Sequence, residues 1–166
     1  MRWIISCLFL TTFVHAQKSP SRTIEFSYRT AVNRLDFFTG PGVSWSQKKI
    51  VGMLHLETGI NRTIFQSAPF PRLSLAFGYN LMEAKKIMFT PLISYSVSAL
   101  TLGKTAHFWN EQYLGYRISF GGSIRVFQES MLGLIQERFK NIQHEQFKFS
   151  NWGYFGSIGV SVALGN

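Results

Sequence analysis

Apolar and polar residues alternate along most of the chain between positions 35 and 165. The clearest segment is 72–81, where every odd position is apolar and every even position is polar or small. A period of two places successive side chains on opposite faces of an extended chain, which is typical of a β-strand. The pattern therefore predicts strands that each have one apolar face and one polar or small face.

Eight such strands are expected, which makes this an all-β chain. They cover residues 23–31, 35–46, 49–60, 72–81, 87–100, 112–127, 132–140 and 152–164. Segment 132–140 also matches the spacing of a helix, so strand and helix both stay open there. Pro91 lacks an amide donor and requires a bulge or an unpaired position within its strand.

The glycine pair at 121–122 allows two interpretations. A tight hairpin turn is one of them, because glycine is common in such turns. A two-residue turn there would pair Ile118 with Arg125 and mix the apolar face with the charged one. We therefore expect one continuous strand over 112–127.

The connections between these strands alternate in length. From the second strand onward, short connections at 47–48, 82–86 and 128–131 alternate with long ones at 61–71, 101–111 and 141–151. Outer-membrane barrels have short periplasmic turns and longer extracellular loops. The sequence thus predicts an eight-stranded antiparallel up-and-down transmembrane β-barrel with both termini in the periplasm.

The N-terminus has the features of a secretory signal peptide. Arg2 supplies the positive start, residues 3–14 are apolar, and Ala16 is a small residue at the expected cleavage point. Residues 1–16 are therefore expected to be a cleaved signal peptide and residues 17–166 a single outer-membrane barrel domain. Cys7 lies within the signal, so the mature chain would have no disulfide, catalytic cysteine or thiolate metal site.

Composition and charge agree with an exported membrane barrel. Aromatic residues make up 16% of the chain, and its formal net charge is +9. Basic charge on an exported protein favours anionic lipid head groups or lipopolysaccharide phosphates over nucleic acid. The simpler alternative is that these charges only solvate turns and loops.

Two stretches resemble a known family. LGYRISFGGSIRVF at 114–127, followed by LGL at 132–134, and WGYFGSIGVSVAL at 152–164 resemble the final strands of the small outer-membrane β-barrel superfamily of Gram-negative bacteria. That superfamily includes outer membrane protein X and the barrel domain of outer membrane protein A. The resemblance implies a monomeric barrel in the cell outer membrane. Members often end in an aromatic residue, whereas this chain ends in Gly165 and Asn166.

His55 and Glu57 are the candidate catalytic pair. They lie two positions apart, so both point to one side of their strand, which by phase is the lumen. A carboxylate can orient an imidazole as a general base, and some barrels of this kind are lipid A deacylases or palmitoyltransferases. The favoured alternative is a polar lumen network of His55 and Glu57 with Arg72, Arg117 and Arg125, because buried charges need partners.

Several aromatic residues fall in the predicted outer loops. They form either a partner-binding edge or a membrane-interface girdle, and the set is Phe65, Phe70, His107, Phe108 and Trp109. A metal site using His107, Glu111, His144 and Glu145 is not supported by their spacing, so no metal or cofactor is expected. The expected partners are outer-membrane lipid or lipopolysaccharide and a surface or periplasmic protein.

Three functions follow, in order of preference. The first is a non-enzymatic integral outer-membrane barrel with a structural or surface-interaction role through its extracellular loops. The second is a lipid A-modifying barrel enzyme. The third is a soluble exported β-barrel that would bind an apolar ligand inside, with its polar face outward.

Overall fold

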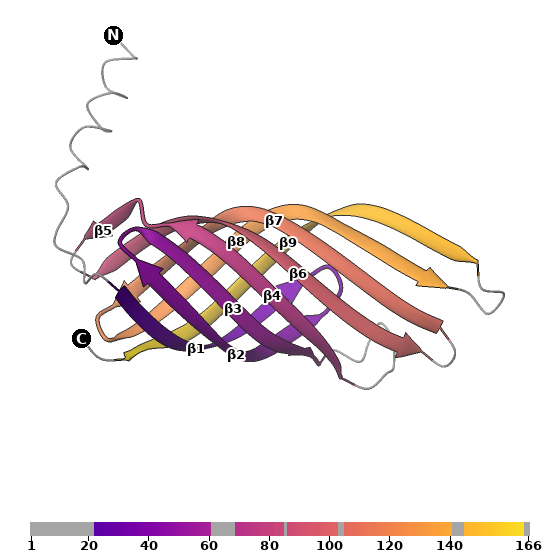
Figure 1. The fold of residues 1–166 in the computed structure, drawn as a ribbon, viewed down its shortest axis with the longest axis horizontal. Helices are drawn as coiled ribbons and strands as arrows, with labels where there is room; N and C mark the ends of the chain where they lie inside the picture. The colour runs from indigo at the N-terminus through magenta and orange to yellow at the C-terminus, as the bar shows by residue number, and fades with distance from the viewer. Residues whose placement is uncertain (1–21, 61–68, 85, 103–104, 141–144, 165–166) are drawn as a thin grey trace, which may run out of the picture.

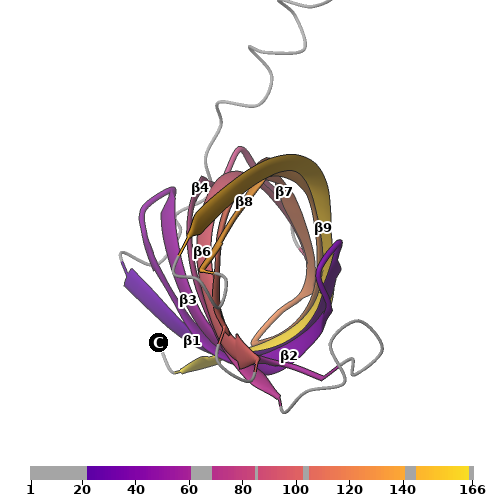
Figure 2. The same ribbon diagram turned by 90° about the vertical axis from the view of Figure 1, so that its right-hand side faces the viewer.

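The computed structural model describes residues 22–60, 69–84, 86–102, 105–140 and 145–164, which form a closed antiparallel barrel (Figures 1 and 2). Eight long strands make the wall, and the three-residue strand β5 (Met82–Ala84) pairs with the start of β6. The long strands are β1 (Arg22–Asn33), β2 (Phe37–Gln47), β3 (Ile50–Gly59), β4 (Phe70–Tyr79), β6 (Ile87–Leu102), β7 (Thr105–Gly121), β8 (Ile124–Lys140) and β9 (Gln146–Leu164). The predicted eight-stranded antiparallel up-and-down barrel is confirmed.

Two pairings close the ring. Strand β1 pairs with β9, and β4 pairs with β6, so no strand of the wall lacks a neighbour on either side. The start of β1 and the end of β9 lie at the same end of the barrel, together with the β2–β3 and β7–β8 turns (left in Figure 1). We call this the turn end. Within the described ranges, no helix is long and apolar enough to cross a membrane.

The barrel is apolar outside and polar inside. Along β1, Glu25, Ser27 and Arg29 are buried, whereas Ile24, Phe26 and Tyr28 between them are at least half exposed. The same alternation continues around the wall, with exposed fractions of 61% for Ile50 and 67% for Leu114. The outer surface is thus formed by large apolar side chains, and the lumen holds the buried polar and charged side chains together with buried aromatic ones such as Phe38 and Phe155.

The expected continuous strand over 112–127 is wrong. A hairpin turn separates β7 from β8, with Gly121 opposite Arg125 and Phe120 opposite Val126. Three residues therefore lie between the closing partners, one more than in a two-residue turn. An odd number of turn residues keeps Gly121 and Arg125 on the lumen side and Phe120 and Val126 on the outer side, so the faces are not mixed. Segment 132–140 is a strand within β8.

Two of the three predicted long loops are also wrong. Strands β6 and β7 pair up to Leu102 opposite Thr105, and β8 and β9 pair up to Lys140 opposite Gln146. Segments 101–111 and 141–151 are thus mostly strand. In the third predicted loop, 61–71, Phe70 and Pro71 belong to β4, and residues 61–68 lie outside the described ranges. The predicted signal peptide and its cleavage point also lie outside the described ranges.

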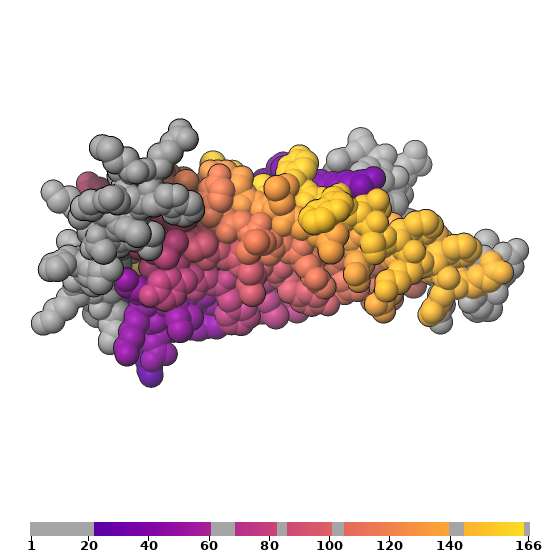
Figure 3. Space-filling model, turned by 90° about the horizontal axis from the view of Figure 1, so that it is seen from above, coloured from indigo at the N-terminus to yellow at the C-terminus, as the bar shows by residue number. Residues whose placement is uncertain are grey.

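Strands β6 to β9 run past the closed part of the wall. The β4–β6 pairing starts at Arg72 and Ser98, and the β1–β9 pairing stops at Asn33 and Phe155. We call the four-stranded sheet beyond these points the outer extension; it consists of residues 99–102, 105–110, 135–140 and 146–153. It projects to the right in Figure 1, and Figure 3 shows its orange and yellow residues narrowing toward that end.

Pro91 lies in β6 just beyond the part of the strand that pairs with β4, so its lack of an amide donor removes no hydrogen bond to β4. The β4–β6 ladder stops at Gly78 opposite Leu92, one residue before the proline. Prolines within sheets are confined to such unpaired positions. The predicted unpaired position is found on the β4 side only, since Pro91 is opposite Tyr116 of β7 on the other side.

We predict that Gly121→Ala destabilises the barrel, whereas Gly122→Ala does not. Gly121 has a φ of 129°, and a Cβ there would lie 2.1 Å from the Ile124 carbonyl oxygen. Such a backbone conformation costs a non-glycine residue roughly 1–3 kcal/mol. A Cβ on Gly122 would meet no atom within 4 Å. Urea unfolding of the two variants in detergent micelles measures the difference, and equal midpoints would contradict the turn geometry.

Candidate functional site

The lumen is filled by a ladder of side chains with alternating charge. Six residues from β1, β3, β4, β7 and β8 form it, each ion-paired to the next. In order they are Arg117, Glu129, Arg29, Glu57, Arg72 and Glu111. We call this set the charge ladder.

Glu57 is the centre of the charge ladder. Its Oε1 accepts a hydrogen bond from Arg29 Nε at 2.6 Å, and its Oε2 accepts one from Arg72 Nη1 at 2.6 Å. The side chains of these three residues are at most 1% exposed. One carboxylate therefore joins strands β1, β3 and β4 by two charge-assisted hydrogen bonds, which are about twice as strong as neutral ones.

The two arginines reach further partners. Arg29 Nη1 donates to Glu129 at 2.8 Å, and Arg72 Nη2 donates to Glu111 at 2.7 Å. Uncharged donors add to both carboxylates, since Ser157 donates to Glu129 Oε2 at 2.6 Å and Asn33 donates to Glu111 Oε2 at 2.9 Å. Each buried charge in the ladder's middle thus has an ion-pair partner and a hydrogen bond, although Arg29 Nη2 and Glu129 Oε1 have no hydrogen-bond partner within the described ranges.

Aromatic rings fill the space around the guanidinium groups. The Arg72 guanidinium carbon lies 4.8 Å from the ring centre of Phe38 and 4.9 Å from that of Phe155. Arg29 lies 5.1 Å from the same Phe155 ring. Cations at this distance are attracted to the ring faces, so the lumen is packed as well as charge-paired.

A separate ion pair lies nearer the turn end. Arg125 donates to Glu25, and Ser161 donates to the other oxygen of Glu25 at 2.9 Å. Together with the charge ladder, this pair holds four arginines and four glutamates, which cancel. The formal net charge of +9 is therefore carried by residues outside these two groups.

His55 does not have the surroundings of a catalytic base. Its Nε2 lies 3.2 Å from Ser27 Oγ, but both oxygens of Glu57 are occupied by arginines. Its Nδ1 has no hydrogen-bond partner within the described ranges, and the residue is 1% exposed. The ring packs against Gly42, where an added Cβ would lie 2.1 Å from it. A buried imidazole without an orienting carboxylate offers no access to a lipid substrate, so this geometry does not favour the enzyme hypothesis.

Three of the aromatic residues assigned to loops lie elsewhere. Phe70 is in β4 and Trp109 in β7, and their rings are buried inside the barrel with centres 5.7 Å apart. Phe108, also in β7, is 55% exposed on the outer surface. Phe70 and Trp109 are therefore not girdle or loop-tip residues, because their strands begin earlier than expected and place them on the inward face. Phe65 lies outside the described ranges.

His107 belongs to an aromatic row on the inward face of the outer extension. Its ring stacks on Trp109 at 5.7 Å and on Phe139 at 5.0 Å. Phe139 in turn stacks on Phe147 at 5.3 Å and on Phe149 at 5.9 Å. His107 Nδ1 also lies 3.1 Å from Glu137 Oε1. No group of three His, Cys, Asp or Glu able to hold a metal occurs in the described part of the chain, and His144 is outside it.

Three members of the charge ladder were missed from sequence: Arg29, Glu111 and Glu129. Arg29 had a visible signal, because Glu25, Ser27 and Arg29 alternate with apolar residues. Glu111 falls in a predicted loop and Glu129 in a predicted turn, so their inward phase could not be inferred. The residues that were named, Glu57, Arg72 and Arg117, lie in the ladder, whereas Arg125 lies in the separate pair.

Comparison with known proteins finds similar structures but no similar family model or curated sequence. The N-terminal β-barrel domain of OprF from Pseudomonas aeruginosa is 9% identical, with 86% of this chain and 97% of that chain covered and a TM-score of 0.42. A major outer membrane protein of Thermus thermophilus is 9% identical, with 85% and 99% covered and a TM-score of 0.48. Neisserial surface protein A is 12% identical, with 85% and 94% covered and a TM-score of 0.45. All three identities are below 25% and all three TM-scores are below 0.5, so the barrel fold rests on the strand pairing of this chain.

We predict that Glu57→Gln strongly destabilises the barrel. The substitution keeps the size of the side chain but leaves Arg29 and Arg72 without their shared carboxylate, and breaking a buried ion pair costs about 3–5 kcal/mol. The matched control is Glu137→Gln, which removes a carboxylate paired with His107 at the partly exposed surface and should cost about 0–1 kcal/mol. Equal unfolding midpoints for the two variants in urea would show that the ladder does not hold the barrel together.

Proposed function

We propose that this chain is a non-enzymatic integral protein of the cell outer membrane whose outer extension interacts with lipopolysaccharide. One observation carries the proposal: the polarity of the two faces inverts along β8 and β9. In the closed barrel these strands are polar inward and apolar outward. In the outer extension the same strands are aromatic inward and polar outward.

Strand β9 shows the inversion most clearly. Between residues 154 and 164 its outward side chains include Tyr154, Ile158 and Val160, and its inward ones include Ser157 and Ser161. Beyond Trp152, the outward positions carry Gln146, Lys148 and Ser150, and the inward ones carry Phe147 and Phe149. Strand β8 changes in the same way, from outward Leu132 and Leu134 to outward Gln136 and Arg138.

An inversion at one level indicates a change of solvent at that level. Apolar outward residues fit hydrocarbon, and polar outward residues fit water or lipid head groups. Trp152 is 76% exposed on the outer surface where the change occurs. Tryptophan favours the interface between membrane and water, so Trp152 would mark the outer boundary of the bilayer.

The turn end carries a second set of interfacial side chains. Trp45 and Phe77 meet edge to face at 6.1 Å, and Lys49 Nζ lies 5.8 Å from the ring centre of Tyr79. Aromatic girdles flank the apolar band of membrane barrels at both interfaces. This end would face the periplasm, because the signal peptide expected from sequence places the mature N-terminus there.

The outward face of the outer extension fits an anionic partner. Arg138 and Lys148 are directly opposite each other on β8 and β9, and both are exposed. Like charges in directly opposite positions repel each other. A phosphate group between them would relieve that repulsion, and lipopolysaccharide presents phosphates just above the bilayer.

The lumen is blocked by the charge ladder, which supports a structural and binding role over conduction.

We predict that Leu75→Arg prevents insertion into the outer membrane. Leu75 faces outward in the middle of β4, between Leu54 and Tyr95 on the neighbouring strands. An arginine facing lipid near the bilayer midplane costs about 2–4 kcal/mol. The matched control is Gln136→Arg, which lies beyond the apolar band and should insert normally. The readout is an outer-membrane band whose gel mobility shifts on boiling.

Either of two results would contradict membrane insertion. One is recovery of the unsubstituted protein in the soluble periplasmic fraction. The other is equal insertion of the two arginine variants, because a barrel in water has no depth-dependent cost. The first result would support the soluble-barrel hypothesis instead.

We predict that replacing both Arg138 and Lys148 by Gln weakens binding to lipopolysaccharide. Each basic residue near an anionic membrane surface contributes about 1 kcal/mol, so the double variant should bind roughly thirtyfold less tightly. The control is Lys49→Gln with Lys86→Gln, which removes the same charge from the turn end. Sedimentation of the purified barrel with lipopolysaccharide aggregates at several salt concentrations measures the effect. Equal losses of affinity in both double variants would show that binding depends on the net charge of the protein and not on the outer extension.

A further inference from the structure

Arg117, at one end of the charge ladder, has fewer hydrogen-bond acceptors than its donors require. Every inner member has charged partners on both sides, whereas Arg117 reaches only Glu129, with Nε 3.5 Å from its Oε1. Its Nη1 donates to the Met53 thioether at 3.0 Å, and thioether sulfur is a weak acceptor. Its Nη2 has no partner among the residues that the structure describes, although the residue is only 3% exposed.

The guanidinium group is held in place despite its missing acceptors. Its carbon lies 3.5 Å from the centre of the Phe127 ring, which fixes the plane of the group. The hydrogen bonds that Arg29 and Ser157 donate to Glu129 are both accepted by its Oε2, and its Oε1 has no hydrogen-bond partner within the described ranges. A small turn of Arg117 would bring its Nε onto that Oε1, and its Nη2 would still lack an acceptor. A buried cation with free donors costs several kcal/mol unless an anion or another acceptor is present.

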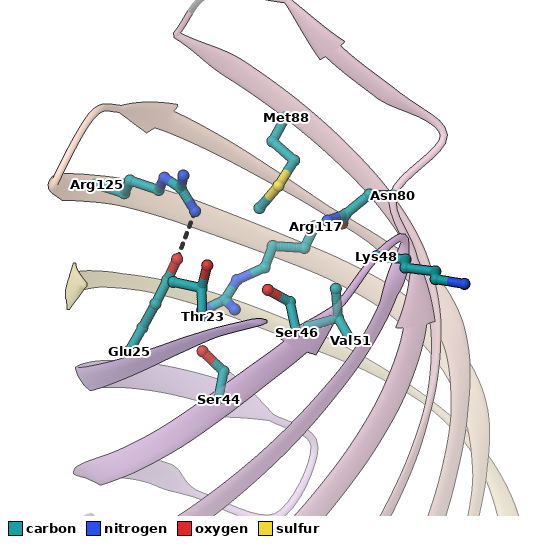
Figure 4. A pocket seen from close by; sticks show the side chains of 10 residues that line it. All are labelled: Thr23, Glu25, Ser44, Ser46, Lys48, Val51, Asn80, Met88, Arg117 and Arg125. Carbon is teal, nitrogen blue, oxygen red and sulfur yellow. Dashed lines mark hydrogen bonds and ion pairs between the residues drawn. The ribbon is translucent and has the colours of Figure 1, made fainter. Parts of the chain in front are cut away.

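A pocket lies beside this group at the turn end of the lumen. Arg117 lines it from β7, together with Thr23 of β1 and Ser44 and Ser46 of β2 (Figure 4). The cavity measures about 50 Å³. A bound water needs about 10–15 Å³ on this scale, so the space suits three or four oxygen atoms. Thr23 and Ser46 are partly exposed, which gives access from the turn end.

The lining of the pocket carries more positive than negative charge. Three hydroxyl groups and two guanidinium groups, those of Arg117 and Arg125, face the space. The carboxylate of the lining, Glu25, already accepts from Arg125 and Ser161. Lys48 also belongs to the rim, and Figure 4 shows its ammonium turned away from the pocket. This arrangement suits an anion of small size and excludes a metal cation.

We propose that the pocket binds a small tetrahedral oxyanion of the phosphate type, with Arg117 as the charged anchor and the hydroxyls of Ser44, Ser46 and Thr23 as further donors. The anion completes the charge ladder at its open end. The proposal depends on the proposed function only for the compartment, which would be the periplasm. The ligand's phosphate group has two possible sources there, free inorganic phosphate and the head of a phosphate monoester.

The test uses protein purified in its folded form from membranes of cells that express the full-length chain. Inorganic phosphate and glycerol 3-phosphate are titrated separately at constant ionic strength, with chloride as the reference anion. Heat of binding and the midpoint of thermal unfolding are recorded. We expect saturable binding of at least one phosphate species together with a rise in the unfolding midpoint, and the tighter of the two identifies the source.

Two variants locate the site. Arg117→Lys keeps the charge but loses the fork of donors, and we expect it to weaken phosphate binding by about tenfold or more. Ser46→Glu places a carboxylate in the pocket, so we expect it to raise the unfolding midpoint without phosphate and to abolish the phosphate response. The control is Ser98→Ala, which removes a buried hydroxyl of β6 that does not line the pocket and should leave phosphate binding unchanged.

Either of two results would overturn the proposal. One is an equal response to phosphate and chloride, which would reflect ionic strength alone. The other is unchanged phosphate binding in Ser46→Glu, which would place the anion elsewhere. Membrane insertion is scored on the same samples by heat-shifted gel mobility, so a failure of the anion site is distinguished from a failure of the proposed membrane location.

Discussion

The structure depends on keeping buried charges paired inside a ring of eight strands. An interior of this width holds side chains and no free channel, and here six of those side chains form the charge ladder. Because Glu57 bonds to Arg29 and Arg72, residues far apart in the sequence must reach one level of the lumen at the same time. The strand register satisfies this requirement, since Glu57 is directly opposite Arg72 on β4. Stability and register are therefore specified by the same contacts.

The paired lumen also determines the surface. Since the ladder and the Glu25–Arg125 pair cancel their charges, the basic surplus lies outside them. Some of it lies at the turn end, with Lys49 over the Tyr79 ring, and some on the outer extension, with Arg138 opposite Lys148. A protein with a neutral interior and basic ends is suited to a bilayer whose head groups are anionic. Pairing of charges in the interior thus leaves the positive surplus at the two ends of the barrel.

Much of the fold was predictable from sequence, because period-two alternation depends only on which face each side chain takes. The β7–β8 turn was not predictable, because two or three residues could close it, and the number decides which side chains of the following strand face the lumen. The outer extension was missed because both faces of 105–109 carry aromatic or histidine side chains, His107 and Trp109 inward and Phe108 outward, which removes the alternation. The ladder's partners were not predictable either, since the approach of Arg29 to both Glu57 and Glu129 depends on the closed register around the ring.

The inversion of polarity along β8 and β9 links these observations. A strand keeps its inward and outward phase over its whole length, so residues on one line of the sheet face in one direction throughout. In β9 the inward line changes from Ser161 and Ser157 to Phe149 and Phe147, and the outward line changes from Val160 and Ile158 to Ser150 and Lys148. A barrel surrounded by water would have no reason to exchange its faces at one level. A barrel that leaves the hydrocarbon at Trp152 would have that reason, since only its surroundings change there.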